Sequence, residues 1–177
     1  MTLHTDSITN YQLASDLWNF SGRDGVVNYS ITREFGGLGG VGISEQEAGF
    51  IRAVFTQIDE LTGLTFQETD YANADITTVS VAGYADPRVM GLAVNSSEHQ
   101  RMFATWADEA GANLTFEEAE TIMHEIGHAV GLGHPHGNGF APGINEHDTI
   151  MSYHDTGAFV GYSATDIAAL QSLWGVG

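Results

Sequence analysis

The chain has 177 residues, with five Lys and Arg against 23 Asp and Glu, and a formal net charge of −18. It contains no cysteine, which excludes disulfides, thiolate metal sites and a cysteine nucleophile. A field this negative repels nucleic acid and anionic membranes, so neither is expected as a partner. No apolar run approaches the ~20 residues of a membrane span, and no signal peptide is visible at the N-terminus.

Helices and strands are predicted along the whole chain, without a linker or an internal repeat, so we expect one domain over residues 1–177. Two capping boxes mark helix starts, one at Ser44–Glu47 and one at Thr115–Glu118. Gly63 ends the first of these helices and Gly131 the second. The predicted helices cover 11–18, 44–62, 115–131 and 163–173, and the predicted strands cover 26–32, 64–68, 75–81, 89–94 and 101–106. This order predicts an α+β fold in which a twisted mixed sheet is backed by two long helices.

The second long helix carries His124 and His128, which are four residues apart and therefore lie on one helical face. Glu125 follows His124 and can reach a metal-bound water without being a ligand. Gly131 lets the chain leave the helix sharply, so that His134 can return as a third ligand. Three histidines around zinc leave a fourth position open for water, as catalytic zinc sites do. A pair of buried, hydrogen-bonded helix histidines is the alternative interpretation.

The segment His124-Glu-Ile-Gly-His-Ala-Val-Gly-Leu-Gly-His-Pro135, followed by Thr149-Ile-Met-Ser-Tyr153, resembles the metzincins, most closely the bacterial serralysins. The resemblance is strong over residues 121–175, which include Tyr162–Gly175, and looser matches lie at Leu61–Phe66 and Ala74–Ile76. The resemblance implies a metzincin catalytic domain, with the active-site helix at 115–131 and the C-terminal helix at 163–173. Serralysins usually continue into a β-roll of calcium-binding Gly-Gly-x-Gly-x-Asp repeats, and this sequence contains none.

The resemblance also implies roles for individual residues. His124, His128 and His134 would bind one Zn²⁺ per chain, and Glu125 would be the general base. Met151 would belong to the Met-turn beneath the metal. Tyr153 would act twice, as a zinc ligand at rest and as a donor to the oxyanion during catalysis. A Ca²⁺ ion is conceivable on so acidic a surface, but no motif supports it.

The function that the resemblance implies is that of a secreted, extracellular zinc endopeptidase, expected to be a monomer, which hydrolyses a protein or peptide substrate with zinc-activated water. The substrate would lie as an extended strand against an edge strand of the sheet, for which Val89–Val94 is the candidate. Two other interpretations remain open. One is a catalytically inactive zinc-holding module that binds proteins, and the other is an acidic structural or inhibitor-like protein that uses zinc for stability.

The run Gly37-Leu-Gly-Gly-Val-Gly42 satisfies the dinucleotide-binding pattern Gly-x-Gly-x-x-Gly. The helix after it is capped by Ser44, beyond the last glycine, so its N-terminus is not where a pyrophosphate would need it. The acidic chain also opposes an anionic ligand. We therefore interpret the run as a loop.

Overall fold

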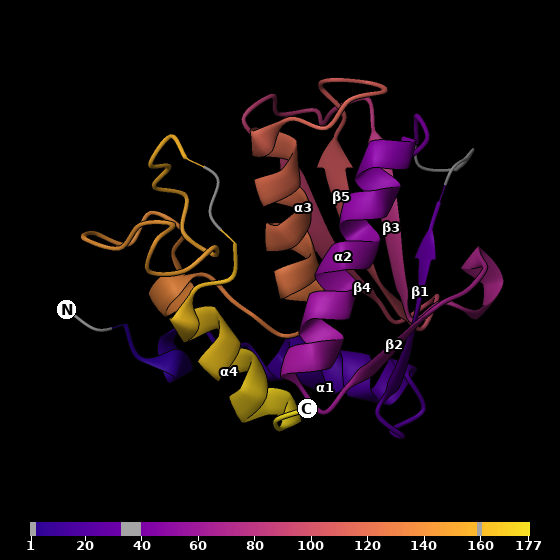
Figure 1. Ribbon diagram of the computed structural model, residues 1–177, viewed down its shortest axis with the longest axis horizontal. Coiled ribbons are helices and arrows are strands. Elements are labelled where there is room, and N and C mark those ends of the chain that lie inside the picture. The colour runs from indigo at the N-terminus through magenta and orange to yellow at the C-terminus, as the bar shows by residue number, and fades with distance from the viewer. Residues whose placement is uncertain (1–2, 33–39, 159–160) are drawn as a thin grey trace.

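A five-stranded mixed sheet, in the order β2-β1-β3-β5-β4, forms the centre of the molecule (Figure 1). The computed structural model describes residues 3–32, 40–158 and 161–177. The first four strands in this order run parallel to one another, and β4 at the edge is antiparallel to β5. The strands are β1 (Val26–Ile31), β2 (Thr65–Glu68), β3 (Ile76–Val81), β4 (Gly91–Ser96) and β5 (Arg101–Ala107).

Two helices lie side by side over one face of this sheet, α2 and α3 (Figure 1). Both begin in capping boxes, in which the side chain of Ser44 or Thr115 accepts from the N3 amide while Glu47 or Glu118 reaches back. The helices are α1 (Tyr11–Phe20), α2 (Glu45–Leu61), α3 (Phe116–Ala129) and α4 (Ala164–Trp174), with short 3₁₀ turns at Thr5–Ser7, Tyr71–Asn73 and Pro135–Gly137.

The hydrophobic core fills the space between the sheet and these helices. Phe55 of α2 is fully buried and stacks on Tyr29 of β1, with ring centroids 4.1 Å apart. Ile122 and Ile126 of α3 are also fully buried in the same cluster. The apolar face of α3 that carries Ile122 and Ile126 packs on β4 and β5, so this packing fixes the whole helix next to the edge of the sheet.

Most element predictions are confirmed, with small shifts at the ends. Each of the four helices lies where its caps and spacing place it. The fourth strand begins at Gly91 rather than Val89, because residues 86–89 form a turn in which Val89 N donates to Asp86 O. Gly37 and Gly39 of the glycine run lie outside the described residues. In the described part of the chain, no helix combines the length and the apolar character that crossing a membrane would require.

Candidate metal centre

The last two turns of α3 place His124 and His128 on one face, and each ring is fixed by a backbone carbonyl. His124 Nδ1 lies 2.9 Å from Ile150 O, and His128 Nδ1 lies 2.9 Å from Leu132 O. A carbonyl oxygen only accepts, so both Nδ1 atoms carry the hydrogen. The Nε2 atom of each neutral ring is therefore left with a free lone pair, which is the state in which imidazole binds a metal.

The third histidine reaches the site through a tight turn after α3. Gly131 has φ +103°, and a Cβ there would lie 2.9 Å from the side chains of Ala14 and Leu173. Only glycine combines that conformation with that closeness. The turn is then held from outside the helix, because Asn10 N donates to Gly131 O and Gly133 N donates to Ile8 O.

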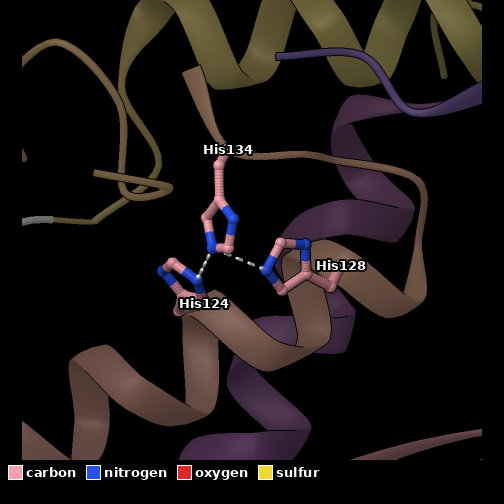
Figure 2. Close-up of side chains that lie close together, drawn as sticks. All are labelled: His124, His128 and His134. Atoms are coloured by element: carbon pink, nitrogen blue, oxygen red, sulfur yellow. Dashed lines mark hydrogen bonds between the residues drawn. The ribbon is translucent and has the colours of Figure 1, made fainter. Parts of the chain in front are cut away.

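The three Nε2 atoms converge on one point (Figure 2). His134 Nε2 lies 3.2 Å from His124 Nε2 and 3.2 Å from His128 Nε2. Nitrogens bound to one tetrahedral zinc at 2.0–2.1 Å would be about 3.3 Å apart, so the spacing matches a shared zinc ion. His134 Nε2 carries at most one hydrogen and can donate to only one of its two neighbours. The other contact brings two lone pairs together, which is unfavourable unless a cation lies between them.

Burial favours the neutral, metal-binding form of these rings. It lowers the pKa of His124 to about 3, helped by the nearby His128 and His134 and opposed by the bond to Ile150 O. It also lowers the pKa of His128 to about 4, and it lowers the pKa of the less buried His134. The three rings are the cluster of metal-ligating side chains found among the described residues.

Glu125 lies beside the three histidines, with a carboxyl group that is almost entirely buried. The residue is 5% exposed, and Oε2 has no hydrogen-bond partner. Burial raises the pKa of Glu125 to about 8, against the opposing effect of the Ala93 amide of β4. A buried carboxyl oxygen without a partner is costly, and a water or a substrate group at this point would satisfy it.

Tyr153 packs against two of the histidine rings, and Met151 packs against α3. The Tyr153 ring is 47% exposed, and its centroid lies 4.7 Å from that of His134 and 5.3 Å from that of His124. Met151 is fully buried, and its sulfur lies 3.0 Å from the position that a Cβ on Gly127 would take. The structure thus brings together all six residues that the sequence singles out.

Comparisons with known proteins do not lead to the metzincin family that the motif suggests. No family model matches the chain, and no curated protein matches it. Among solved structures, the fold is shared with a chain of the GM1-bound form of the ECX AB5 holotoxin. The two are 16% identical with a TM-score of 0.58, over 98% of this chain and 86% of that chain. At this identity the likeness shows the fold.

These findings correct the family drawn from the zinc motif. No family model and no curated protein matches the chain, and a solved structure that shares its fold is described as the GM1-bound form of a holotoxin, so no comparison supports the metzincin family. The predicted metzincin catalytic domain is corrected to a small α+β fold with a five-stranded mixed sheet, like that of the holotoxin chain. The physical reason is that the motif specifies a helix, a turn and a ligand set, and such a local site is compatible with more than one fold.

The function and the partners that depended on the family are corrected with it. No comparison supports the secreted serralysin-like endopeptidase, or the inactive protein-binding module given as its alternative. The monomer that binds an extended peptide is corrected as well, because it depended on the metzincin family, whereas a solved structure that shares this fold is described as the GM1-bound form of an AB5 holotoxin. Assembly and GM1 binding are properties of that holotoxin.

Sequence reasoning missed two residues that shape the site. Gly91 of β4 faces Glu125, and a Cβ there would lie 2.7 Å from Glu125 Cγ. Asp166 of α4 is fully buried and accepts hydrogen bonds from Thr149 Oγ1 at 2.5 Å and Ile150 N at 3.0 Å. Ser163-x-x-Asp166 is visible as a capping pattern, but nothing in the sequence shows that Asp166 also binds the amide of Ile150, whose carbonyl oxygen accepts from His124 Nδ1.

Proposed function

We propose that His124, His128 and His134 bind one zinc ion and that Glu125 activates the water held there. The observation that carries the proposal is the convergence of three Nε2 atoms at 3.2 Å contacts that hydrogen bonding alone cannot satisfy. Three neutral imidazoles leave one position of a tetrahedral zinc open, and zinc in such a site supplies a water of strongly lowered pKa. This chemistry suits attack of water on an electrophilic centre.

Glu125 would accept the proton that this water loses. Its carboxyl is buried beside the three rings, and its Oε2 has no other partner. A base held this way loses little entropy in the reaction, because burial and the Ala93 amide already fix its position. The proton can then pass to the leaving group, since Glu125 lines the same cavity as His128 and His134.

Tyr153 is proposed as the group that donates to the charge that develops on the substrate. Its ring centroid lies 4.7 Å from that of His134, and a tyrosine side chain that is half exposed can move without disturbing the core. A ligand role toward the zinc ion at rest remains part of this proposal. Both roles place the hydroxyl on the open side of the three histidines.

We also propose an extracellular site of action, on the basis of the likeness in fold alone. The structure that shares the fold is a holotoxin, and toxins act outside the cell that makes them. The acidic surface of this chain, at net charge −18, gives no independent argument for a compartment.

The proposal is tested by metal analysis together with hydrolysis of an activated ester, p-nitrophenyl acetate. We expect one zinc per chain, and ester hydrolysis that a chelator removes and added zinc restores. His128→Ala should lose zinc and hydrolysis together. Glu125→Gln should retain zinc and lose hydrolysis by roughly 10²- to 10⁴-fold, the usual contribution of a general base.

Two results would contradict the proposal. A chain that binds no transition metal after zinc loading would remove the metal centre altogether. A Glu125→Gln variant with unchanged hydrolysis would remove Glu125 as the base and leave the zinc site intact. Glu60→Gln, on the exposed side of α2, is the matched control for the loss of one carboxylate.

A further inference from the structure

A glycine in the loop after the third histidine lies directly against the ring of Tyr153. A Cβ placed on Gly139 would lie 2.5 Å from Tyr153 Cε2 and 2.8 Å from Tyr153 Cγ, and it would also meet Cδ2. Carbon atoms that are not bonded to each other pack at about 3.5–4.0 Å, so no larger residue fits at this position while the ring stays where it is. The contact runs along one edge of the ring from Cγ to Cε2, so a movement of the hydroxyl end alone would not relieve it.

The backbone at Gly139 does not itself require glycine. Its φ lies outside the left-handed region, unlike that of Gly137 and Gly143 nearby. At such a position alanine usually stabilises a protein, because it reduces the conformational freedom of the unfolded chain. The three atoms nearest to an added Cβ all belong to Tyr153. The position of this ring is therefore the feature of the described structure that explains a glycine here.

The loop that carries Gly139 begins at a proposed metal ligand. Gly137 N donates to His134 O at 2.9 Å, and the turn passes through two consecutive left-handed residues, His136 with φ 53° and Gly137 with φ 77°. Gly139 follows two residues later, and its carbonyl oxygen accepts from Tyr153 N at 2.7 Å. A short, tightly turned segment therefore connects His134 to both the backbone and the ring of Tyr153.

Three other rings also lie close to that of Tyr153. The centroid distances are 4.7 Å to His134, 5.1 Å to Phe140 and 5.3 Å to His124, whose ring is within 22° of parallel. A group that donates to a developing charge must be held within about 0.5 Å of its productive position. The neighbouring rings limit where the Tyr153 ring can lie, and the close approach to Gly139 fixes its distance from the loop.

We propose that Gly139 is a positioning residue for Tyr153, which sets the place of the ring, and with it the hydroxyl group, relative to His134. A side chain at position 139 would move the ring away from the loop, and the hydroxyl would no longer lie where a substrate at the metal centre needs it. The proposal rests on the function proposed above for what the hydroxyl does, and on the contacts of Gly139 for how the ring is held.

The position of the ring is measured by fluorine NMR on the full, zinc-free chain labelled with meta-fluorotyrosine. The chain has six tyrosines, and the resonance of Tyr153 is the one that is absent in Tyr153→Phe. We expect Gly139→Ala to shift this resonance, because the ring moves relative to the rings of His124 and His134. Gly161→Ala is the matched control and should leave it unchanged. Gly161 also lies outside the helices, its φ is not left-handed, and the nearest atom to an added Cβ is 3.9 Å away.

The consequence of that position is measured by zinc-dependent hydrolysis of p-nitrophenyl acetate. We expect Gly139→Ala to retain zinc and to lower kcat by about 10-fold or more, with KM changed by less than about twofold. In the Tyr153→Phe chain, the same substitution should lower kcat by less than about twofold further, because the hydroxyl that it displaces is already absent. A glycine with a merely structural role would lower kcat by the same factor in both chains.

An unshifted Tyr153 resonance in Gly139→Ala would overturn the proposal, and so would losses in kcat that multiply in the double variant. If Gly139→Ala fails to fold, which circular dichroism detects, it is combined with Tyr153→Ala. Removing the ring should restore folding, and a double variant that stays unfolded would overturn the proposal. A chain without zinc-dependent hydrolysis would remove the proposed function, while the resonance of the zinc-free chain would still decide whether Gly139 sets the position of the ring.

Discussion

Two backbone carbonyls decide how the histidines present their nitrogens. Ile150 O and Leu132 O accept from the Nδ1 atoms of His124 and His128, so both rings direct Nε2 inward. The spacing of the histidines predicts that they share a metal, but it does not predict these partners. Ile150 lies 26 residues beyond His124, and its amide donates to Asp166 of α4. Such contacts depend on tertiary structure and leave no local pattern in the sequence.

Gly91→Ala tests whether the position of Glu125 matters, because it displaces the carboxyl group without substituting Glu125 itself. The new Cβ would lie 2.7 Å from both Glu125 Cγ and Thr121 Cγ2, so the carboxyl group must move. We expect unchanged zinc content and ester hydrolysis lowered by about 10²-fold, the cost of a misplacement near 1 Å. Gly49→Ala is the matched control, because nothing lies within 4 Å of a Cβ at that exposed helical position. Normal hydrolysis by Gly91→Ala would show that catalysis does not need Glu125 in this place.

Tyr153→Phe tests the proposed donor. Removing the hydroxyl should leave the ring packed against His124 and His134, and zinc binding close to normal. We expect kcat for ester hydrolysis to fall by roughly 10- to 10³-fold with little change in KM, since the lost interaction forms in the transition state. A higher KM with unchanged kcat would instead mean that Tyr153 only lines the substrate cavity.

At the level of elements, α4 helps to position the metal centre, because it binds the segment that contacts His124. Asp166 sits in its first turn and holds both Thr149 and Ile150, while Ser163 N donates to the same carboxyl group at 2.8 Å. Burial raises the pKa of Asp166, and these hydrogen bonds oppose that rise. The segment that carries Ile150 O is therefore positioned by a helix cap.

Asp166→Ala should leave three donors without a partner in a buried place. We expect the free energy of unfolding to fall by about 2–4 kcal/mol, measured by urea denaturation. Zinc affinity should fall as well, because Ile150 O would no longer be held against His124. Glu60→Ala, an exposed acid on α2, should change neither quantity. Full zinc affinity in a destabilised Asp166→Ala chain would show that Asp166 stabilises the fold without contributing to zinc binding.

The ends of helices were more predictable than the sheet. Ser44, Thr115 and Ser163 each begin a helix because a cap is a local hydrogen-bond pattern that residues three apart can complete. The order of strands, with β3 between β1 and β5, depends on pairing between residues that are 47 apart for β1 and β3 and 26 apart for β3 and β5. The candidate edge strand does lie at the edge, as β4. Its start was misplaced because Asp86 and Val89 form a turn that periodicity does not reveal.

The whole molecule carries more negative charge than its few cations can pair. Five Arg and no Lys face 23 acids, and Arg52–Glu68 and Arg88–Asp86 are paired already. Repulsion among the remaining carboxylates should therefore lower the free energy of unfolding at low ionic strength. The family could not be predicted at this scale, because a short motif determines a site and says little of the remaining chain.

Sodium chloride should accordingly raise Tm at pH 7.5. Screening shortens the reach of each charge from ~30 Å at 0.01 M salt to ~10 Å at 0.1 M, so most of the gain should come below 0.2 M. The double variant Glu60→Gln/Glu98→Gln, which removes two exposed carboxylates, should have a higher Tm at low salt and a smaller salt increment. A Tm independent of salt in both proteins would show that the surface charges are already balanced.

The turn that delivers His134 is tied to the first ten residues of the chain, through Ile8 O and the backbone amide of Asn10. More than 120 residues of chain separate these partners, so the third ligand is in place only when the N-terminal segment has found the end of α3. Contacts over such distances form slowly, since a large loop must close first. During refolding, tight zinc binding should therefore occur later than helix formation. The time at which zinc binds would report when the N-terminal segment docks against the end of α3.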